Sequence, residues 1–253
     1  MMSVPVLEAK GLSKTYAAQI GQPARHALSD LDLRIEPGET FGLLGPNGAG
    51  KTTSQKLFLG LVRPTRGEIR LFGESPENPD VRNRIGYLPE NPYFYQHLTG
   101  EEFLRFCGGL FKLPRQVVDE RADRLLTQVR MQDARKVQLK KYSKGMLQRV
   151  GIAQALINDP ELVLLDEPMS GLDPVGRHEF RELILDLKRQ GKTIFFNSHI
   201  LSDVSEICDR VGILVEGQLA AEAAIADLSR DGRDLETLFM ETVRNPKTAA
   251  VAV

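Results

Sequence analysis

The sequence predicts an α/β fold in which a parallel sheet carries a glycine-rich loop and a helical lobe is inserted into the sheet core. Three observations lead to this prediction. Short apolar runs alternate with helical patterns, a glycine-rich segment separates a predicted strand from a predicted helix, and helical periodicity dominates from about 91 to 158. At 253 residues, 42% of them hydrophobic, the chain is long enough for one domain with a satellite lobe.

The composition narrows the classes of partner. Lys and Arg (33) nearly balance Asp and Glu (34), so we expect neither nucleic acid nor an anionic membrane surface as the main partner. Cys107 and Cys208 form no paired motif and are expected to be free, buried thiols in a reducing cytosol. No apolar run approaches the roughly 18 residues of a membrane span, and Met1 to Lys10 lacks the pattern of a signal peptide. We therefore expect a cytoplasmic chain.

The pattern of residues 4–88 predicts several strands and one helix. We expect the helix at 51–60, with Leu57, Phe58 and Leu61 facing the core. Strands are expected at 4–8, 31–35, 40–44, 67–72 and 84–88, with a turn at 37–39.

The second part begins with helices and returns to strands. The pattern predicts helices at 101–110, 115–129, 144–157 and 176–189, strands at 161–165 and 193–198, and a hairpin of 211–215 with 218–222. The last thirty or so residues form a short helical tail, whose end at 246–253 we expect to be frayed.

The glycine-rich segment reads Gly45-Pro46-Asn47-Gly48-Ala49-Gly50-Lys51-Thr52-Thr53. Its glycines let successive backbone N–H groups turn toward one centre, and the N-terminus of the following helix completes an anion cradle. Lys51 then reaches the β- and γ-phosphates of a nucleotide, and the Thr52 hydroxyl binds Mg²⁺. Because a strand enters this segment and a helix leaves it, we expect a phosphate-binding loop and not an ordinary turn.

Two carboxylates follow another buried strand. The apolar run Leu162 to Leu165 leads directly to Asp166 and Glu167. In an open parallel sheet, ligands bind at the carboxyl ends of the strands. Asp166 is expected to hold Mg²⁺ through water, and Glu167 to polarise the attacking water. Acidic residues after a strand are often simple loop caps, so this interpretation depends on the phosphate loop.

A histidine, His199, follows the predicted strand at 193–198. We expect this strand to lie beside the strand of Asp166, which would let the ring of His199 meet the γ-phosphate. A single histidine is more often structural than catalytic, but this position favours a catalytic role.

The segment Tyr142-Ser143-Lys144-Gly145-Met146-Leu147-Gln148-Arg149 completes the pattern. With the elements above, it resembles the ABC (ATP-binding cassette) ATPase family, whose signature is written LSGGQ, and the resemblance covers nearly the whole chain. In that family the segment begins a helix and faces the nucleotide of a second subunit. Ser143 and Gly145 match the positions that touch the γ-phosphate across the dimer, and a hydroxyl with bare backbone at a helix N-terminus suits an anion.

The resemblance implies a phosphate-loop (RecA-like) core with an antiparallel β subdomain and an inserted helical lobe. It implies a single domain over 1–240, in which 1–90 and 159–225 form the catalytic core and 91–158 the helical signature lobe, followed by a helical tail over 226–253.

The resemblance also implies ATP and Mg²⁺ as cofactors and gives roles to particular positions. Tyr16 matches the aromatic residue that stacks on adenine, although a lone tyrosine is usually a packing residue, and Ser170 to Asp173 matches the loop that crosses the dimer interface. The residues expected to bind nucleotide are Tyr16, Gly45, Pro46, Asn47, Gly48, Ala49, Gly50, Lys51, Thr52, Thr53, Ser143, Gly145 and Asp173; those expected to bind metal are Thr52, Asp166 and Glu90; and those expected to act in catalysis are Lys51, Glu167 and His199.

The sequence departs from the family pattern in two places. The signature has Tyr142, Lys144 and Met146 where the family has Leu, Gly and Gln. Glu90 replaces a glutamine that contacts Mg²⁺ and the attacking water, so its carboxylate either binds the metal or points into solvent. The signature at 142–146 and the segment that ends at Glu90 resemble those of the family branch that powers exporters with separately encoded membrane subunits.

The resemblance implies a transport ATPase. Two copies, or one copy and a relative, sandwich two ATP molecules, and closure of this dimer drives separate membrane permease subunits. We expect the chain on the inner face of the cell membrane, with no nucleic acid partner. The docking surface is expected from Glu90 through the helical lobe, where Tyr93, Phe94 and Tyr95 either contact the membrane subunit or belong to the core.

Two other functions compete with transport. One is a soluble ABC ATPase that acts on ribosomes or DNA; such proteins usually carry two cassettes or a long coiled-coil insertion, and this sequence has one cassette and no heptad insertion. The other is a regulatory module that binds nucleotide without hydrolysing it, which the presence of Glu167 and His199 argues against.

Overall fold

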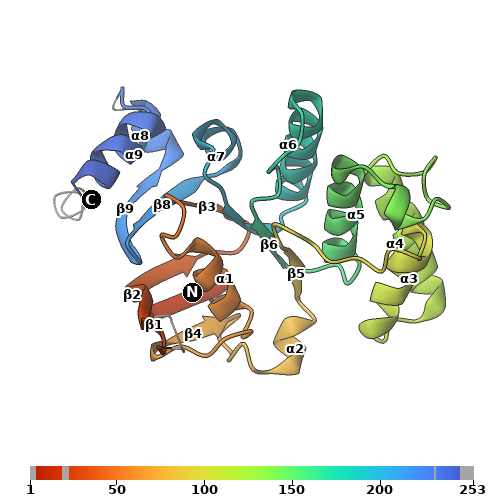
Figure 1. Ribbon diagram of the computed structural model, residues 1–253, viewed down its shortest axis with the longest axis horizontal. Helices are drawn as coiled ribbons and strands as arrows, with labels where there is room; N and C mark the ends of the chain where they lie inside the picture. The colour runs from red at the N-terminus through yellow and green to blue at the C-terminus, as the bar shows by residue number, and fades with distance from the viewer. Residues whose placement is uncertain (1–3, 19–22, 231, 246–253) are drawn as a thin grey trace. The chain divides into compact units, whose positions relative to one another are not determined.

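The computed structural model describes residues 4–18, 23–230 and 232–245 (Figure 1). The chain divides into two compact units. The first unit is built from both ends of the chain, up to residue 82 and from residue 193 onward, and the second from 83–192.

One sheet of the first unit is antiparallel and has the strand order β2-β1-β4 (Figure 1). The strand β1 (Leu7–Tyr16) lies between β2 (Arg25–Ile35) and β4 (Arg66–Leu71). This sheet confirms the expected antiparallel β subdomain. The strand β1 extends well beyond the predicted 4–8, because it continues through register shifts between Ala9 and Leu12 that a regular apolar alternation does not reveal.

The second sheet of the first unit carries the phosphate loop. Its central strand β3 (Thr40–Leu44) is parallel to both β7 (Thr193–Asn197) and β8 (Arg210–Val215), and β8 forms an antiparallel hairpin with β9 (Gln218–Ala224). Every residue of β3 and β7 is buried, as expected for apolar strands covered on both faces. The helices described in this unit are α1 (Lys51–Phe58), α2 (Pro79–Arg82), α7 (Leu201–Ile207), α8 (Ile225–Arg230) and α9 (Leu235–Arg244).

The end of α1 corrects one prediction. The helix stops at Phe58, and Gly60 adopts a φ of 65°, so the helical period is broken before Leu61. Leu57 and Phe58 are fully buried as expected, but Leu61 is 62% exposed. The prediction that Leu61 faces the core was therefore wrong, because the turn carries it away from the buried side of α1.

The second unit combines a parallel strand pair with helices. The strands β5 (Ile85–Leu88) and β6 (Leu162–Asp166) pair directly. The helices described here are α3 (Gly100–Leu110), α4 (Arg115–Gln128), the 3-10 turn η1 (Leu139–Lys141), α5 (Lys144–Leu156) and α6 (Pro174–Arg189). The helical lobe is thus confirmed. The compact unit is wider than the predicted 91–158, because it also includes β5, β6 and α6.

The helix α5 is exposed at its N-terminus and buried along its C-terminal half. From Val150 to Leu156 nearly every residue is buried, while Ser143 and Lys144 at the start of the helix are exposed. A helix that is apolar on all sides belongs in the interior, so α5 is anchored by its C-terminal half and presents its N-terminus at the surface.

The remaining features concern the tail, the cysteines and membrane spans. The helices α8 and α9 lie in the predicted tail, and the expectation of a frayed end at 246–253 lies outside the described residues. Cys107 and Cys208 are free and buried as predicted, and burial raises the pKa of Cys107 to about 12. Among the helices of 4–18, 23–230 and 232–245, none is long and apolar enough to span a membrane.

Candidate active site

The phosphate loop of the first unit is held against neighbouring strands at a distance that only glycine permits. A Cβ atom on Gly50, whose φ is 114°, would lie 2.4 Å from the carbonyl oxygen of Ala27 on β2. A Cβ atom on Gly45 would lie 2.3 Å from the carbonyl oxygen of Leu214 on β8. The backbone of the loop is therefore fixed by β2 and β8, and the glycines are needed for this close approach.

Lys51 lies over the loop that precedes it. Its side chain is 7% exposed, and Nζ donates hydrogen bonds to the carbonyl oxygens of Gly45 at 2.6 Å and Pro46 at 3.3 Å. No side chain caps the N-terminus of α1 at Gly50, so the first-turn N–H groups remain suited to an anion. The exposed residues of the segment are Pro46, Asn47, Gly48 and Thr52, whereas Gly45, Ala49 and Gly50 are buried and Thr53 is half-buried.

His199 lies at the same sheet edge as this loop. The strand β7 pairs with β3 up to Leu43 and Asn197, and the N–H of Ser198 donates to the carbonyl oxygen of Leu43 at 3.3 Å. The imidazole of His199 is exposed just beyond that point. Within the first unit, the structure thus places His199 and the phosphate loop at the carboxyl ends of adjacent strands, where ligands of such sheets bind.

Tyr16 ends β1 and stands opposite Arg25 of β2. Its ring is 37% exposed, and the ammonium group of Lys14 lies 5.1 Å from the ring centroid. The ring is therefore a surface platform and not a member of the hydrophobic core.

The acidic residues of the second unit gather at one edge of its strand pair. Leu88 of β5 is in register with Leu165 of β6, so Glu90, Asp166 and Glu167 all follow the same ends of the two parallel strands. Asp166 is 2% exposed, Glu167 is half-buried with a φ of 48°, and Glu90 is exposed. The carbonyl oxygen of Glu90 accepts a hydrogen bond from the Gln148 amide at 3.4 Å, which links this edge to α5.

The pKa of the Tyr87 phenol on β5 is affected by the negative charge at this edge. Burial raises its pKa to about 12, and the negative charge of Asp166 adds to the rise. The buried Asp166 carboxylate therefore acts on its neighbours as a negative charge at the end of β6.

The residues present fit Mg²⁺ as a bound metal. Within the described parts of the chain, no cluster of three or more His, Cys, Asp or Glu side chains forms a complete metal cage. Mg²⁺ is usually held by one or two carboxylates together with substrate phosphates and water. In the second unit, the buried carboxylate of Asp166 at the end of β6 is an oxygen ligand of this kind.

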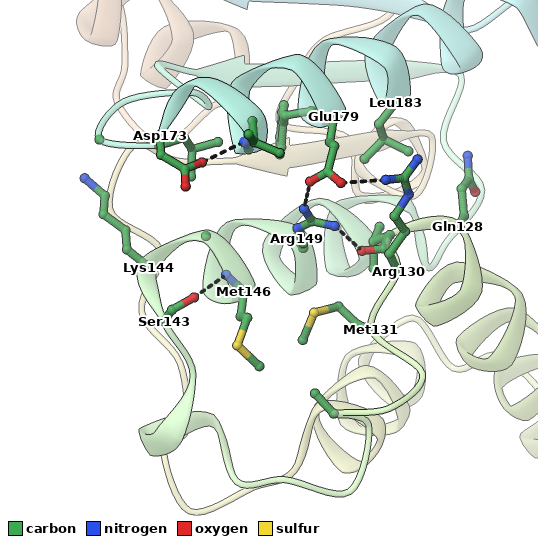
Figure 2. A pocket seen from close by; sticks show the side chains of 18 of the residues that line it. Gln128, Arg130, Met131, Ser143, Lys144, Met146, Arg149, Asp173, Glu179 and Leu183 are labelled. Atoms are coloured by element: carbon green, nitrogen blue, oxygen red, sulfur yellow. Dashed lines mark hydrogen bonds and ion pairs between the residues drawn. The ribbon is translucent and has the colours of Figure 1, made fainter.

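The signature-like segment forms a helix start. Ser143 is the N-cap of α5, and its hydroxyl oxygen accepts a hydrogen bond from the Met146 N–H at 3.2 Å. A Cβ atom built on Gly145 would lie 3.7 Å from a methyl carbon of Leu172, an ordinary van der Waals contact. Figure 2 shows Ser143 and Lys144 at the first turn of α5, beside a pocket of about 730 Å³.

The segment 170–173 lies on the same pocket. Asp173 is the N-cap of α6, and its carboxylate accepts a hydrogen bond from the Gly176 N–H at 2.7 Å. The side chain of Lys144 covers Gly171, where an added Cβ would meet Nζ at 2.2 Å. The start of α5 and the segment 170–173, both predicted to face a second subunit, thus lie side by side on one pocket (Figure 2).

Tyr142 has a structural reason for its departure from the family pattern. It is 8% exposed, and its hydroxyl donates a hydrogen bond to the carbonyl oxygen of Ala134 at 2.7 Å. Burial also raises the pKa of this phenol. A leucine would leave the Ala134 carbonyl without this donor.

Sequence reasoning missed the ion pairs that line the pocket. Glu179 of α6 contacts both Arg149 of α5 and Arg130, which follows α4 (Figure 2). These residues are widely separated in the chain and form no recognisable motif. The available signal was Glu179, a charged residue within the predicted helix at 176–189 that is half-buried in the structure.

Known ABC transporter proteins are similar to this chain in sequence. Residues 28–170 match the family model described as ABC transporter. An uncharacterized ABC transporter ATP-binding protein of Nostoc sp. is 56% identical over 204 residues, which are 80% of this chain and 61% of that protein. A fluoroquinolones export ATP-binding protein of Mycobacterium tuberculosis is 42% identical over 220 residues, 85% of this chain and 70% of that protein. The chain thus spans less than two thirds of the length of the Nostoc relative.

Solved structures are similar over nearly their whole length. The ATP-binding subunit of an ABC transporter superimposes with a TM-score of 0.82 at 34% identity, over 93% of this chain and 98% of that one. An ATP-binding cassette solved as a dimer in a post-hydrolysis state with ADP and Pi has a TM-score of 0.79 at 25% identity, over 87% and 98% of the two chains.

Proposed function

This chain belongs to the ABC transporter family of ATP-binding proteins, and we propose that it binds and hydrolyses ATP to drive separate membrane subunits. The observation that carries the proposal is the phosphate loop, whose backbone is fixed by β2 and β8 and whose Lys51 is held over it. The similar cassette with bound ADP and Pi supports hydrolysis.

The proposed roles follow from the chemistry of each side chain. Lys51 and the N–H groups of the loop hold the β- and γ-phosphates. Asp166 and Thr52 hold Mg²⁺, which neutralises phosphate charge when bound. Glu167 accepts a proton from the attacking water as general base, and His199 donates to the γ-phosphate.

We further propose that the site is completed by a second ATP-binding subunit, either identical or related. Ser143 is exposed and Gly145 is half-buried at the start of a helix, where backbone N–H groups suit an anion. The hydroxyl of Ser143 uses its oxygen as an acceptor within α5, which leaves its hydrogen to donate to an anion. The dimeric state of the similar cassette supports this arrangement.

The second unit offers a docking surface for the membrane subunit. Tyr93 is 98% exposed, and Tyr95 packs edge-on against Phe106 with ring centroids 5.1 Å apart. Phe94 instead is buried against Phe103, so only part of the predicted aromatic cluster is available. Exposed aromatic residues of this kind suit the apolar face of a partner helix. Docking there would hold the chain at the inner face of the cell membrane.

We propose export as the direction of transport. The Mycobacterium tuberculosis relative is named for fluoroquinolone export, and it is 42% identical to this chain. The relatives and structures described above carry transporter names, which favours transport over action on ribosomes or DNA.

The test is ATP binding and turnover by the purified chain and by Lys51→Ala. We expect wild type to bind ATP and the variant to bind about a hundredfold more weakly, since hydrogen bonds to charged groups contribute about 1.5–3 kcal/mol each. Lys56→Ala is the matched control, because Lys56 is an exposed lysine on the same helix. Near-normal ATP affinity in Lys51→Ala would overturn the assignment.

A further inference from the structure

Arg25 occupies a specific position beside the phosphate loop. It is the first residue of β2 and stands directly opposite Tyr16 of β1. Residues paired in this way lie on the same face of the sheet with their Cβ atoms about 5 Å apart. Arg25 lies before the residues 28–170 that match the family model, so the family comparison gives it no role.

The guanidinium group of Arg25 reaches the loop itself. Its Nη2 donates a hydrogen bond to the carbonyl oxygen of Gly48 at 3.3 Å. A Cβ atom on Gly48 would have that same nitrogen, at 3.7 Å, as its nearest neighbour. The cation is therefore in contact with the loop backbone, on a residue that pairs with Tyr16 in the sheet.

The charge of Arg25 is uncompensated in the described part of the chain. The Gly48 carbonyl is its one hydrogen-bond acceptor among those residues, and no carboxylate there lies within ion-pair distance. A guanidinium has several N–H donors in a planar fork that matches phosphate oxygens. An exposed surface arginine usually finds a carboxylate or only water, whereas this one sits at an anion-binding loop.

We propose that Arg25 binds a phosphate oxygen of the nucleotide, in addition to Lys51 and the loop backbone. This inference rests on the proposed function. The nucleotide would extend from the ring of Tyr16 to the phosphate loop, and Arg25 is paired with Tyr16 and hydrogen-bonded to Gly48 of that loop. Because the side chain is exposed, its contribution is screened by salt and is smaller than that of a buried cation.

The experiment measures the affinity of the full chain for MgATP and MgADP in wild type, Arg25→Gln and Arg25→Lys. We expect Arg25→Gln to bind both about tenfold more weakly, which corresponds to about 1.4 kcal/mol. Arg25→Lys should fall between the two, since it keeps the charge without the fork. The affinity of wild type should also decrease more steeply with added KCl than that of Arg25→Gln.

Arg70→Gln is the matched control. Arg70 is 53% exposed on β4, at the opposite edge of the three-stranded sheet from β2. We expect this variant to bind both nucleotides as wild type does. The melting temperature of the nucleotide-free protein should be unchanged in Arg25→Gln, which separates nucleotide binding from a purely structural hold on Gly48.

Two results would overturn the inference while leaving the proposed function intact. One is equal nucleotide affinity in wild type and Arg25→Gln. The other is a lower melting temperature of the nucleotide-free variant with unchanged affinity, which would make Arg25 a support for the loop only. Failure of wild type to bind either nucleotide would refute the proposed function and this inference with it.

Discussion

Arg149 and Glu179 form an ion pair that joins α5 to α6, although they are thirty residues apart in the chain. Arg149 also donates to the carbonyl oxygen of Val129 at 3.3 Å, at the end of α4, and Arg130 contacts the other oxygen of Glu179 at 2.5 Å. Glu179 therefore connects three helical segments beneath the pocket that Ser143 lines. The starts of α5 and α6 are held in one arrangement by this cluster.

Glu179→Gln should destabilise the second unit. The substitution leaves Arg149 half-buried without its counter-charge, which we expect to reduce the free energy of unfolding by about 1–2 kcal/mol. Urea unfolding followed by circular dichroism measures this change. ATP turnover should decrease as the helix starts loosen, while nucleotide binding by the first unit is retained.

Glu182→Gln provides the control for that change, because Glu182 is an exposed glutamate on the same helix. The two variants should differ clearly in their urea midpoints. Identical midpoints would show that the ion pair contributes nothing measurable.

Glu167→Gln should bind ATP and hydrolyse it very slowly. The amide retains the shape of the side chain but cannot accept the proton of the attacking water, and general base catalysis contributes about 10²- to 10⁴-fold. The variant should accumulate as an ATP-bound dimer, which size-exclusion chromatography with ATP detects. Turnover at the wild-type rate would assign the role of base to another residue.

Ser143→Arg should stop turnover without preventing nucleotide binding by the monomer. Ser143 is exposed at the start of α5, so a long side chain there extends into solvent and does not disturb the fold of the monomer. In the proposed dimer it would occupy the space needed by the γ-phosphate of the nucleotide that the partner subunit binds. Lys141→Arg, at another exposed position nearby, should turn over ATP normally. Full hydrolysis by Ser143→Arg would contradict the dimer model.

Glu90→Gln tests the departure from the family's glutamine. The Glu90 carboxylate lies at the strand edge shared with Asp166, and a further negative charge there should repel phosphates when Mg²⁺ is absent. We expect turnover to stay within about tenfold, a barrier change near 1.4 kcal/mol, and the variant to bind ATP better than wild type in EDTA.

The measurement for Glu90 is the ratio of ATP affinities with Mg²⁺ and with EDTA. The hydrogen bond from Gln148 goes to the backbone carbonyl of residue 90, so the substitution leaves it in place. An equal ratio in wild type and variant would identify Glu90 as a surface residue with no role at the metal.

Short-range chemistry made part of this protein predictable from its amino-acid sequence. The loop from Gly45 to Thr53 and the helix start at Ser143 are set by residues within a few positions of each other, so their patterns are readable without a fold. Buried strands such as β3 and β6 were recognisable because continuous apolar runs of that length are typical of parallel sheets.

Contacts between side chains that are far apart in the sequence became known from the folded structure. The exposure of Leu61, the burial of Phe94 beside an exposed Tyr93, and the pairing of Arg149 with Glu179 all depend on elements that are distant in sequence. The position of Arg25 at the phosphate loop has the same origin, since strand pairing and a single contact to Gly48 place it there. Propensity and periodicity describe residues that are neighbours along the chain. Packing brings together residues that are distant in sequence, and no local pattern predicts those contacts.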